Sequence, residues 1–112
     1  MKNDLLYIDH ILESIEKIES YTNDLTKKEF SKNELVQDAV IRNFEIIGET
    51  SKKISKDTKQ TFHKISWNEI SGMRDKLIHD YMGVDIDVIW TTIKKDLIEL
   101  KHQMTDIKNN LC

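Results

Sequence analysis

The chain has 112 residues, enough for one domain with a single hydrophobic core, here residues 1–112. Its formal net charge of −3 argues against a protein that binds nucleic acid through bulk positive charge, although a local phosphate site stays open. The single cysteine, Cys112, excludes an internal disulfide and a cysteine metal cluster. We expect a cytoplasmic protein, because the sequence has neither a signal-peptide pattern nor a membrane-spanning run of about 20 apolar residues.

Apolar residues at helical spacing predict a first helix over residues 4–22. The stretch 23–34 lacks this period and predicts a loop. It ends in a capping-box sequence, Ser31 to Glu34, which predicts the start of a second helix. Gly48 lies inside that helix. Because a glycine in a helix costs about 1 kcal/mol relative to alanine, we expect close backbone packing at this position.

The polar, lysine-rich stretch 55–64 predicts a helix end followed by a short turn or helix. A second capping box, Ser66 to Glu69, predicts the start of a third main helix that continues to Tyr81. Gly83 is expected to end that helix in a left-handed conformation. Asp85 is expected to cap the last helix.

The last helix carries apolar residues in alternating steps of four and three, which predicts the seam of a bundle or a coiled coil. The seam residues are Ile86, Trp90, Ile93, Leu97, Leu100, Met104, Ile107 and Leu111. With no proline, three glycines and no strand pattern, the sequence predicts an all-α fold. We expect an antiparallel bundle of four main helices, with or without a short fifth.

The common motifs of metal, dinucleotide and phosphate-loop sites are absent from the sequence. What remains is the stretch RDKLIHDY, which contains Arg74, Asp75, His79 and Tyr81. A guanidinium can grip a phosphate in two places, and a histidine can exchange a proton near neutral pH. On a continuous helix, however, His79 lies roughly 140° round from Arg74. That separation favours a site in which a second subunit takes part.

Each of these residues can also have a purely structural role. The spacing of the residues, taken alone, favours that structural role over catalysis. Arg74 can form an ion pair with Asp75, Glu69 or Glu45, His79 can act as a cation at a helix C-terminus, and Tyr81 can be a core or interface aromatic. Other residues are expected to be structural as well: Trp67 and Trp90 in the core, and Arg42 in a network with Glu45 and Glu49. The lysines at 52, 53, 56, 59 and 64 predict a solvated face, with the alternative that they guide RNA to the site.

The stretch RDKLIHDY resembles the R-x-x-x-x-H-x-Y motif of HepT-like ribonuclease toxins in the HEPN superfamily. Two longer segments support the resemblance. Residues 39–49, AVIRNFEIIGE, are similar to the second-helix signature of that family, and residues 65–90 are similar to its central block. The chain departs from the family in having no proline before the tryptophan or in the last helix.

The resemblance implies a helical homodimer that cleaves RNA without a metal or a cofactor. Arg74 and His79 would be the catalytic residues, meeting those of the second subunit at a shared cleft, and Asp75 would support them. The resemblance also implies a partner, an MntA-like minimal nucleotidyltransferase antitoxin that transfers AMP from ATP to Tyr81. The alternative is a non-catalytic helical dimer that binds or scaffolds a nucleotidyltransferase; the intact motif favours the ribonuclease.

Overall fold

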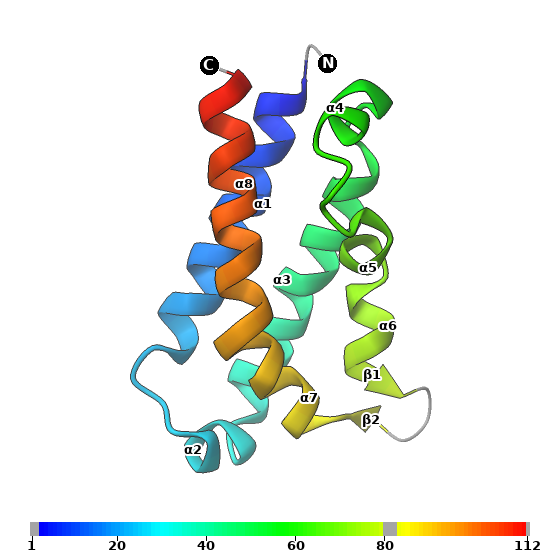
Figure 1. Cartoon of the computed structure of the whole chain (residues 1–112). Coiled ribbons are helices and arrows are strands. Elements are labelled where there is room, and N and C mark those ends of the chain that lie inside the picture. The colour runs from blue at the N-terminus through cyan, green and yellow to red at the C-terminus, as the bar shows by residue number, and fades with distance from the viewer. Residues whose placement is uncertain (1–2, 80–82, 112) are drawn as a thin grey trace.

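The computed structural model describes residues 3–79 and 83–111, and of residues 78–79 and 83–84 it describes only the backbone. Four columns of helix run along the molecule (Figure 1). They are α1 (Asp4–Thr22), α3 (Glu34–Lys52), the pair α5 (Trp67–Ser71) and α6 (Met73–Leu77), and the run α7 (Ile86–Thr91), η2 (Thr92–Asp96) and α8 (Leu97–Leu111). The short helices α2 (Lys27–Ser31) and α4 (Lys56–Thr61) join the columns. The all-α fold class is therefore confirmed.

The segment predicted as a loop before α3 contains the helix α2. Its capping box joins Thr26 to Glu29 and not Ser31 to Glu34 as predicted, while the side chain of Asn33 caps α3 by accepting from the Val36 N–H. The helix is anchored by Phe30, which is fully buried and has its ring centroid 5.3 Å from that of Trp90. Five residues are too few to reveal a helical period, so the burial of one aromatic decides the local structure.

The third main helix ends earlier than predicted. It divides at Gly72 into α5 and α6, stops at Leu77, and the expected capping bond from the Ser66 side chain is not formed. The chain then forms a two-residue antiparallel pair, β1 (Ile78–His79) with β2 (Gly83–Val84). Gly83 therefore lies opposite His79 in β2 and does not end a helix. Tyr81 lies outside the described residues.

Gly48 allows α3 and α5 to approach closely, as expected from its place inside a helix. A Cβ atom at this position would lie 3.0 Å from the carbonyl oxygen of Ser71 and 3.3 Å from that of Ile70. Both atoms belong to the backbone of α5, so no side-chain rotation would relieve the contact. This close approach fixes the column that continues into α6.

The predicted seam of the last helix packs inside the chain, where α8 lies along α1 (Figure 1). The buried apolar residues of this column are Ile89, Ile93, Leu97, Leu100, Met104 and Ile107. Trp90 and Ile86 are half-buried and Leu111 is exposed. Because the seam is covered by the chain's own first helix, it offers no reason to expect a second subunit there. Asp85 caps α7 as predicted, its carboxylate accepting from the Val88 N–H at 3.1 Å.

A buried carboxylate ties the beginning of α1 to the beginning of α4. Asp4 is 1% exposed; its Oδ1 accepts from the Ser55 N–H at 3.0 Å, and its Oδ2 accepts from the hydroxyls of Ser55 and Thr58. Burial raises the pKa of Asp4, but the hydrogen bonds from Ser55 and Thr58 outweigh it and the pKa lies below its usual value. Among the described residues no helix is long and apolar enough to cross a membrane.

Candidate active site

The first half of the motif lies on α6, a helix held by two buried side chains. Met73 and Leu77 face the core, and Leu77 is fully buried. Between them, Arg74 and Asp75 face outward, as expected for residues on the opposite side of one helical turn. The arginine is thus presented at the surface by a helix whose opposite side packs in the core.

Arg74 is joined to α3 by an ion pair. Its Nε lies 3.3 Å from Oε2 of Glu45, and its Nη1 lies 3.8 Å from Oδ1 of Asp75. Of the three structural partners predicted for this arginine, two are present. The Arg74 side chain is 51% exposed, so the ion pair is partly screened by water and contributes at most about 1 kcal/mol.

The geometry of the ion pair leaves most of the guanidinium available. An arginine has five N–H donors arranged as a fork, and Glu45 is bound through Nε, at the side of the fork. Among the residues whose side chains the structure describes, the Nη atoms, which bind an anion in the two-point arrangement, are engaged only by the distant and 87% exposed carboxylate of Asp75. Arg74 can therefore hold its place on α3 and bind a phosphate at the same time.

His79 lies in β1, two residues after the end of α6. Because the helix has ended, the 140° separation calculated for a continuous helix does not apply to Arg74 and His79. The angle between Arg74 and His79 is therefore no longer a reason to expect a second subunit at the site. The side chain of His79 and the whole of Tyr81 lie outside the part of the chain that the structure describes, so the relation of these side chains to Arg74 stays a prediction.

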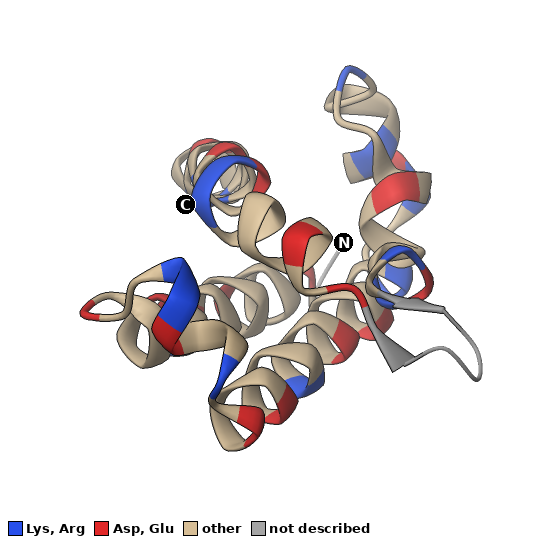
Figure 2. Cartoon of the chain, turned by 90° about the horizontal axis from the view of Figure 1, so that it is seen from below, with Lys and Arg blue, Asp and Glu red and all other residues tan. Residues whose placement is uncertain are grey.

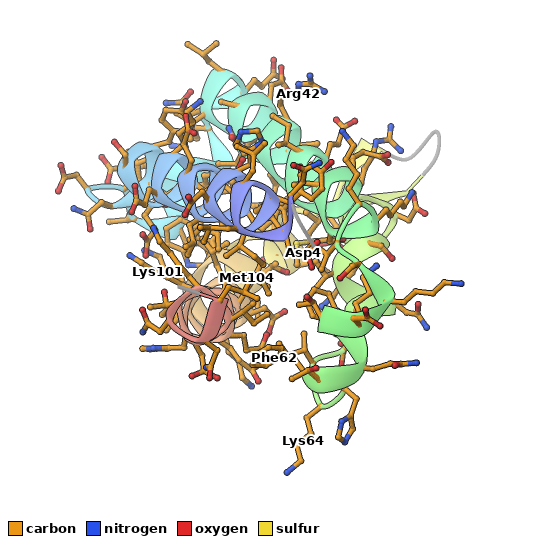
Figure 3. The ribbon with its side chains drawn as sticks, turned by 90° about the horizontal axis from the view of Figure 1, so that it is seen from above. Asp4, Arg42, Phe62, Lys64, Lys101 and Met104 are labelled. Atoms are coloured by element: carbon orange, nitrogen blue, oxygen red, sulfur yellow. The ribbon has the colours of Figure 1, made fainter. Side chains whose placement is uncertain are left out.

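The network predicted for Arg42 is not formed. Glu45 is bound to Arg74, and Glu49 is bound to Lys52 at 3.3 Å. No described residue forms an ion pair with Arg42, which extends away from the bundle in Figure 3.

Seen from the hairpin end in Figure 2, α3 and α6 carry acidic and basic residues side by side.

A groove lies behind α6 that no sequence pattern predicts. This groove, of about 460 Å³, lies between α5–α6 and α8, and the Lys76–Asp96 ion pair at 3.2 Å borders it. Met73 and Lys76 face it, whereas Arg74 on the same helix bonds to α3. A groove between two helices depends on the distance between them, and no local sequence pattern predicts that distance.

Trp67 and Trp90, predicted as core residues, are each half-buried and pack against the core. The indole N–H of Trp67 donates to the carbonyl oxygen of Phe62 at 3.1 Å. This bond ties the start of α5 to the end of α4 and satisfies the polar group that burial would otherwise leave unpaired.

Comparison with known proteins confirms the family resemblance. The family model described as "Ribonuclease HepT-like" matches residues 11–107, and the chain belongs to this family. A probable ribonuclease HepT of Thermococcus cleftensis is 44% identical over 102 residues, covering 91% of this chain and 93% of that protein. A protein of Caldanaerobacter subterraneus subsp. tengcongensis, named as a candidate RNase, is 39% identical and covers 96% of both chains.

A longer relative has the same region as part of a larger protein. A protein of Methanocaldococcus jannaschii, named as a gamma-glutamylcyclotransferase and candidate RNase, is 44% identical over 112 residues. The match covers 99% of this chain but only 50% of that protein, so the chain spans half of its length. No solved structure matches the chain.

Proposed function

We propose that this protein is a metal-independent endoribonuclease toxin, the toxin of a type VII toxin–antitoxin system of the HepT/MntA kind. The observation that carries the proposal is the half-exposed guanidinium of Arg74, anchored through Nε and with its two-point end open, at the start of a family motif that continues to His79. Family membership and the ribonuclease names of the relatives support the same substrate class.

In the proposed reaction, His79 removes the proton from a ribose 2′-hydroxyl. The 2′-oxygen attacks the adjacent phosphorus, the bond to the 5′-oxygen breaks, and that oxygen leaves with a proton returned by the imidazolium. One strand then ends in a 2′,3′-cyclic phosphate and the other in a 5′-hydroxyl. Arg74 stabilises the charge that develops on the phosphoryl oxygens, and Asp75 supports the orientation of the arginine.

The protein would act in the cytoplasm as a homodimer, with the catalytic pairs of the two subunits at a shared cleft. An MntA-like nucleotidyltransferase would neutralise it by transferring AMP from ATP to the hydroxyl of Tyr81, releasing pyrophosphate. Tyr81 belongs to the same short motif as Arg74. The phosphodiester added to it would compete with RNA for the Arg74 guanidinium.

The Arg74–Glu45 ion pair also favours a second candidate function, in which the arginine only stabilises the fold of a non-catalytic dimer that scaffolds a nucleotidyltransferase. Purified protein incubated with RNA in EDTA, beside His79→Ala, separates the two. The ribonuclease predicts cleavage by the wild type and none by the variant. The scaffold predicts intact RNA in both samples and retained binding of the nucleotidyltransferase.

A further inference from the structure

The end of the bundle farthest from the β1–β2 hairpin carries a concentration of lysines. This lysine end is defined by Lys52, Lys53, Lys56, Lys59 and Lys64, which lie on the last turn of α3, on α4 and on the segment after it. Between residues 52 and 64 the only acid is Asp57. Because the whole chain has a net charge of −3, the remaining surface carries more acids than bases.

Most ammonium groups of the lysine end keep their charge free. Lys52 is bound to Glu49, but Lys53 and Lys59 lie over aromatic rings, with Nζ 5.9 Å from the Tyr7 centroid and 5.7 Å from the Trp67 centroid. Such contacts hold a lysine in place without neutralising it. Lys56 and Lys64 are exposed and form no ion pair with any described residue, and Lys64 extends away from the bundle in Figure 3.

Other lysines of the chain are bound to carboxylates. The pairs are Lys17–Glu13, Lys27–Asp87, Lys76–Asp96, Lys101–Glu19 and Lys108–Asp9. A polyanion that approaches this protein is therefore attracted to the lysine end more strongly than to those regions, where each positive charge is already compensated.

Hydrogen bonds tie the start of α4, which carries two lysines of the lysine end, to α1. Ser55 caps α4 by accepting from the Thr58 N–H at 3.3 Å, and Asp4 of α1 binds the backbone and the hydroxyl of Ser55. The Asp4 carboxylate is buried beneath the surface and is satisfied by these bonds. Lys56 and Lys59 are thus presented on a helix whose start is fixed to α1.

The lysine end begins within reach of Arg74. Lys52 follows Glu45 by seven residues on α3, so it lies on the same face of that helix, about 10 Å further along the axis. Glu45 contacts Arg74, and the column α5–α6 connects α4 to the hairpin (Figure 1). A strand bound at Arg74 needs only a few further nucleotides to reach the first lysine.

We propose that the lysine end binds the phosphate backbone of single-stranded RNA on one side of the cleaved bond. The inference rests on the proposed ribonuclease function and adds a second contact region to it. It explains how an acidic protein can hold a polyanion, because the RNA reaches an end of the bundle where several uncompensated lysines lie close together in the sequence. The contact is to phosphates, so it carries no base preference.

The test uses 2′-O-methyl RNA, which lacks the attacking hydroxyl and stays intact. Binding of a 12-nucleotide strand to wild-type protein is compared with binding to Lys56→Gln/Lys64→Gln. The matched control is Lys28→Gln/Lys32→Gln, which removes the same charge from two exposed lysines of the α2 region that are in no ion pair with a described residue. Circular dichroism verifies that both variants are folded.

The lysine-end variant should bind the 12-mer about tenfold more weakly at low salt. The slope of log affinity against log salt should fall by about 1.4, since each lost phosphate contact on a single strand contributes roughly 0.7. The control variant should keep the wild-type slope, and cleavage of an unmodified dinucleotide should be equal in all three proteins. Equal weakening in both variants, no weakening in either, or no binding by the wild type would overturn the inference. Binding at the lysine end without any RNA cleavage would instead refute the proposed ribonuclease.

Discussion

Nε of Arg74 lies 3.3 Å from Oε2 of Glu45, so the motif helix α6 is bonded to α3, the helix that carries the second family signature. The two segments that resemble the family are therefore in contact through the arginine of the motif. Because Glu45 occupies the side of the guanidinium, it can set the direction in which the open end points.

We predict that Glu45→Gln lowers kcat for RNA cleavage about tenfold without raising KM. The amide loses the charge-assisted bond that orients Arg74, but it also removes a negative charge beside the phosphate site. Steady-state kinetics on a short RNA measure both constants. Glu49→Gln is the matched control, since Glu49 lies one turn further along α3 and binds Lys52 instead. Equal kcat in the two variants would remove Glu45 from the catalytic arrangement.

The Asp4 carboxylate should make the stability of the protein fall in acid. Its folded-state pKa lies below the ordinary value of an aspartate, so the unfolded chain binds the proton more readily. The stabilisation is complete above the unfolded pKa and is lost as the pH falls through the folded pKa. Asp4→Asn should cost about 1–3 kcal/mol at pH 7 and less near pH 3.

Urea unfolding at the two pH values measures this difference, with Asp24→Asn as a control on an exposed aspartate. The Asp24 variant should behave as wild type at both values. A cost for Asp4→Asn that is the same at pH 7 and pH 3 would mean that its charge is not what holds α1 to α4.

Gly48→Ala should destabilise the protein even though alanine is the better helix former by about 1 kcal/mol. The new Cβ would lie 3.0 Å from a backbone oxygen of α5, so α3 and α5 must separate, at a cost of about 1–3 kcal/mol. Thermal unfolding should show a lower Tm. Gly72→Ala, whose nearest contact would be 3.3 Å, should cost less. A raised Tm for Gly48→Ala would show that the helix pair is not held at this separation.

Tyr81→Phe should keep ribonuclease activity and escape neutralisation by the nucleotidyltransferase. The variant removes only the hydroxyl that would accept AMP. Incubation with the cognate enzyme and ATP, followed by peptide mass spectrometry, locates the added mass on the wild-type protein. A modification at another residue, or neutralisation with no modification, would leave masking of the cleft as the mechanism.

Much of the fold follows from local patterns. The first helix, residues 4–22, has the bounds predicted from its apolar period, and the close approach at Gly48 follows from the cost of a glycine in a helix. The first helix depends on residues within a few turns of one another, and the expectation at Gly48 depends on the residue type alone, although its contact with Ser71 lies on another helix. The all-α class follows in the same way from the absence of proline and of alternating apolar patterns.

The end of the motif helix could not be predicted by the same means. A helical period continues past Leu77, but the chain turns into β1 because Ile78 and Val84 pair across a hairpin and the Asp85 N–H donates to the Leu77 carbonyl. Such pairing depends on the partner strand across the hairpin, and here it outweighs helix propensity. The sequence also left three acids as possible partners of Arg74. The packing of α3 against α6 brings Glu45 to its Nε, while Asp75 lies near its Nη1.

The central claim is tested most directly by the ends of the RNA products. Wild-type protein with a defined single-stranded RNA in excess EDTA should yield 2′,3′-cyclic phosphate and 5′-hydroxyl ends, identified by mass spectrometry. Arg74→Lys should lose most of this activity, because an ammonium does not reproduce the two-point grip of the guanidinium. Cleavage that stops in EDTA, returns with a divalent ion and leaves 5′-phosphate ends would contradict the Arg74–His79 mechanism.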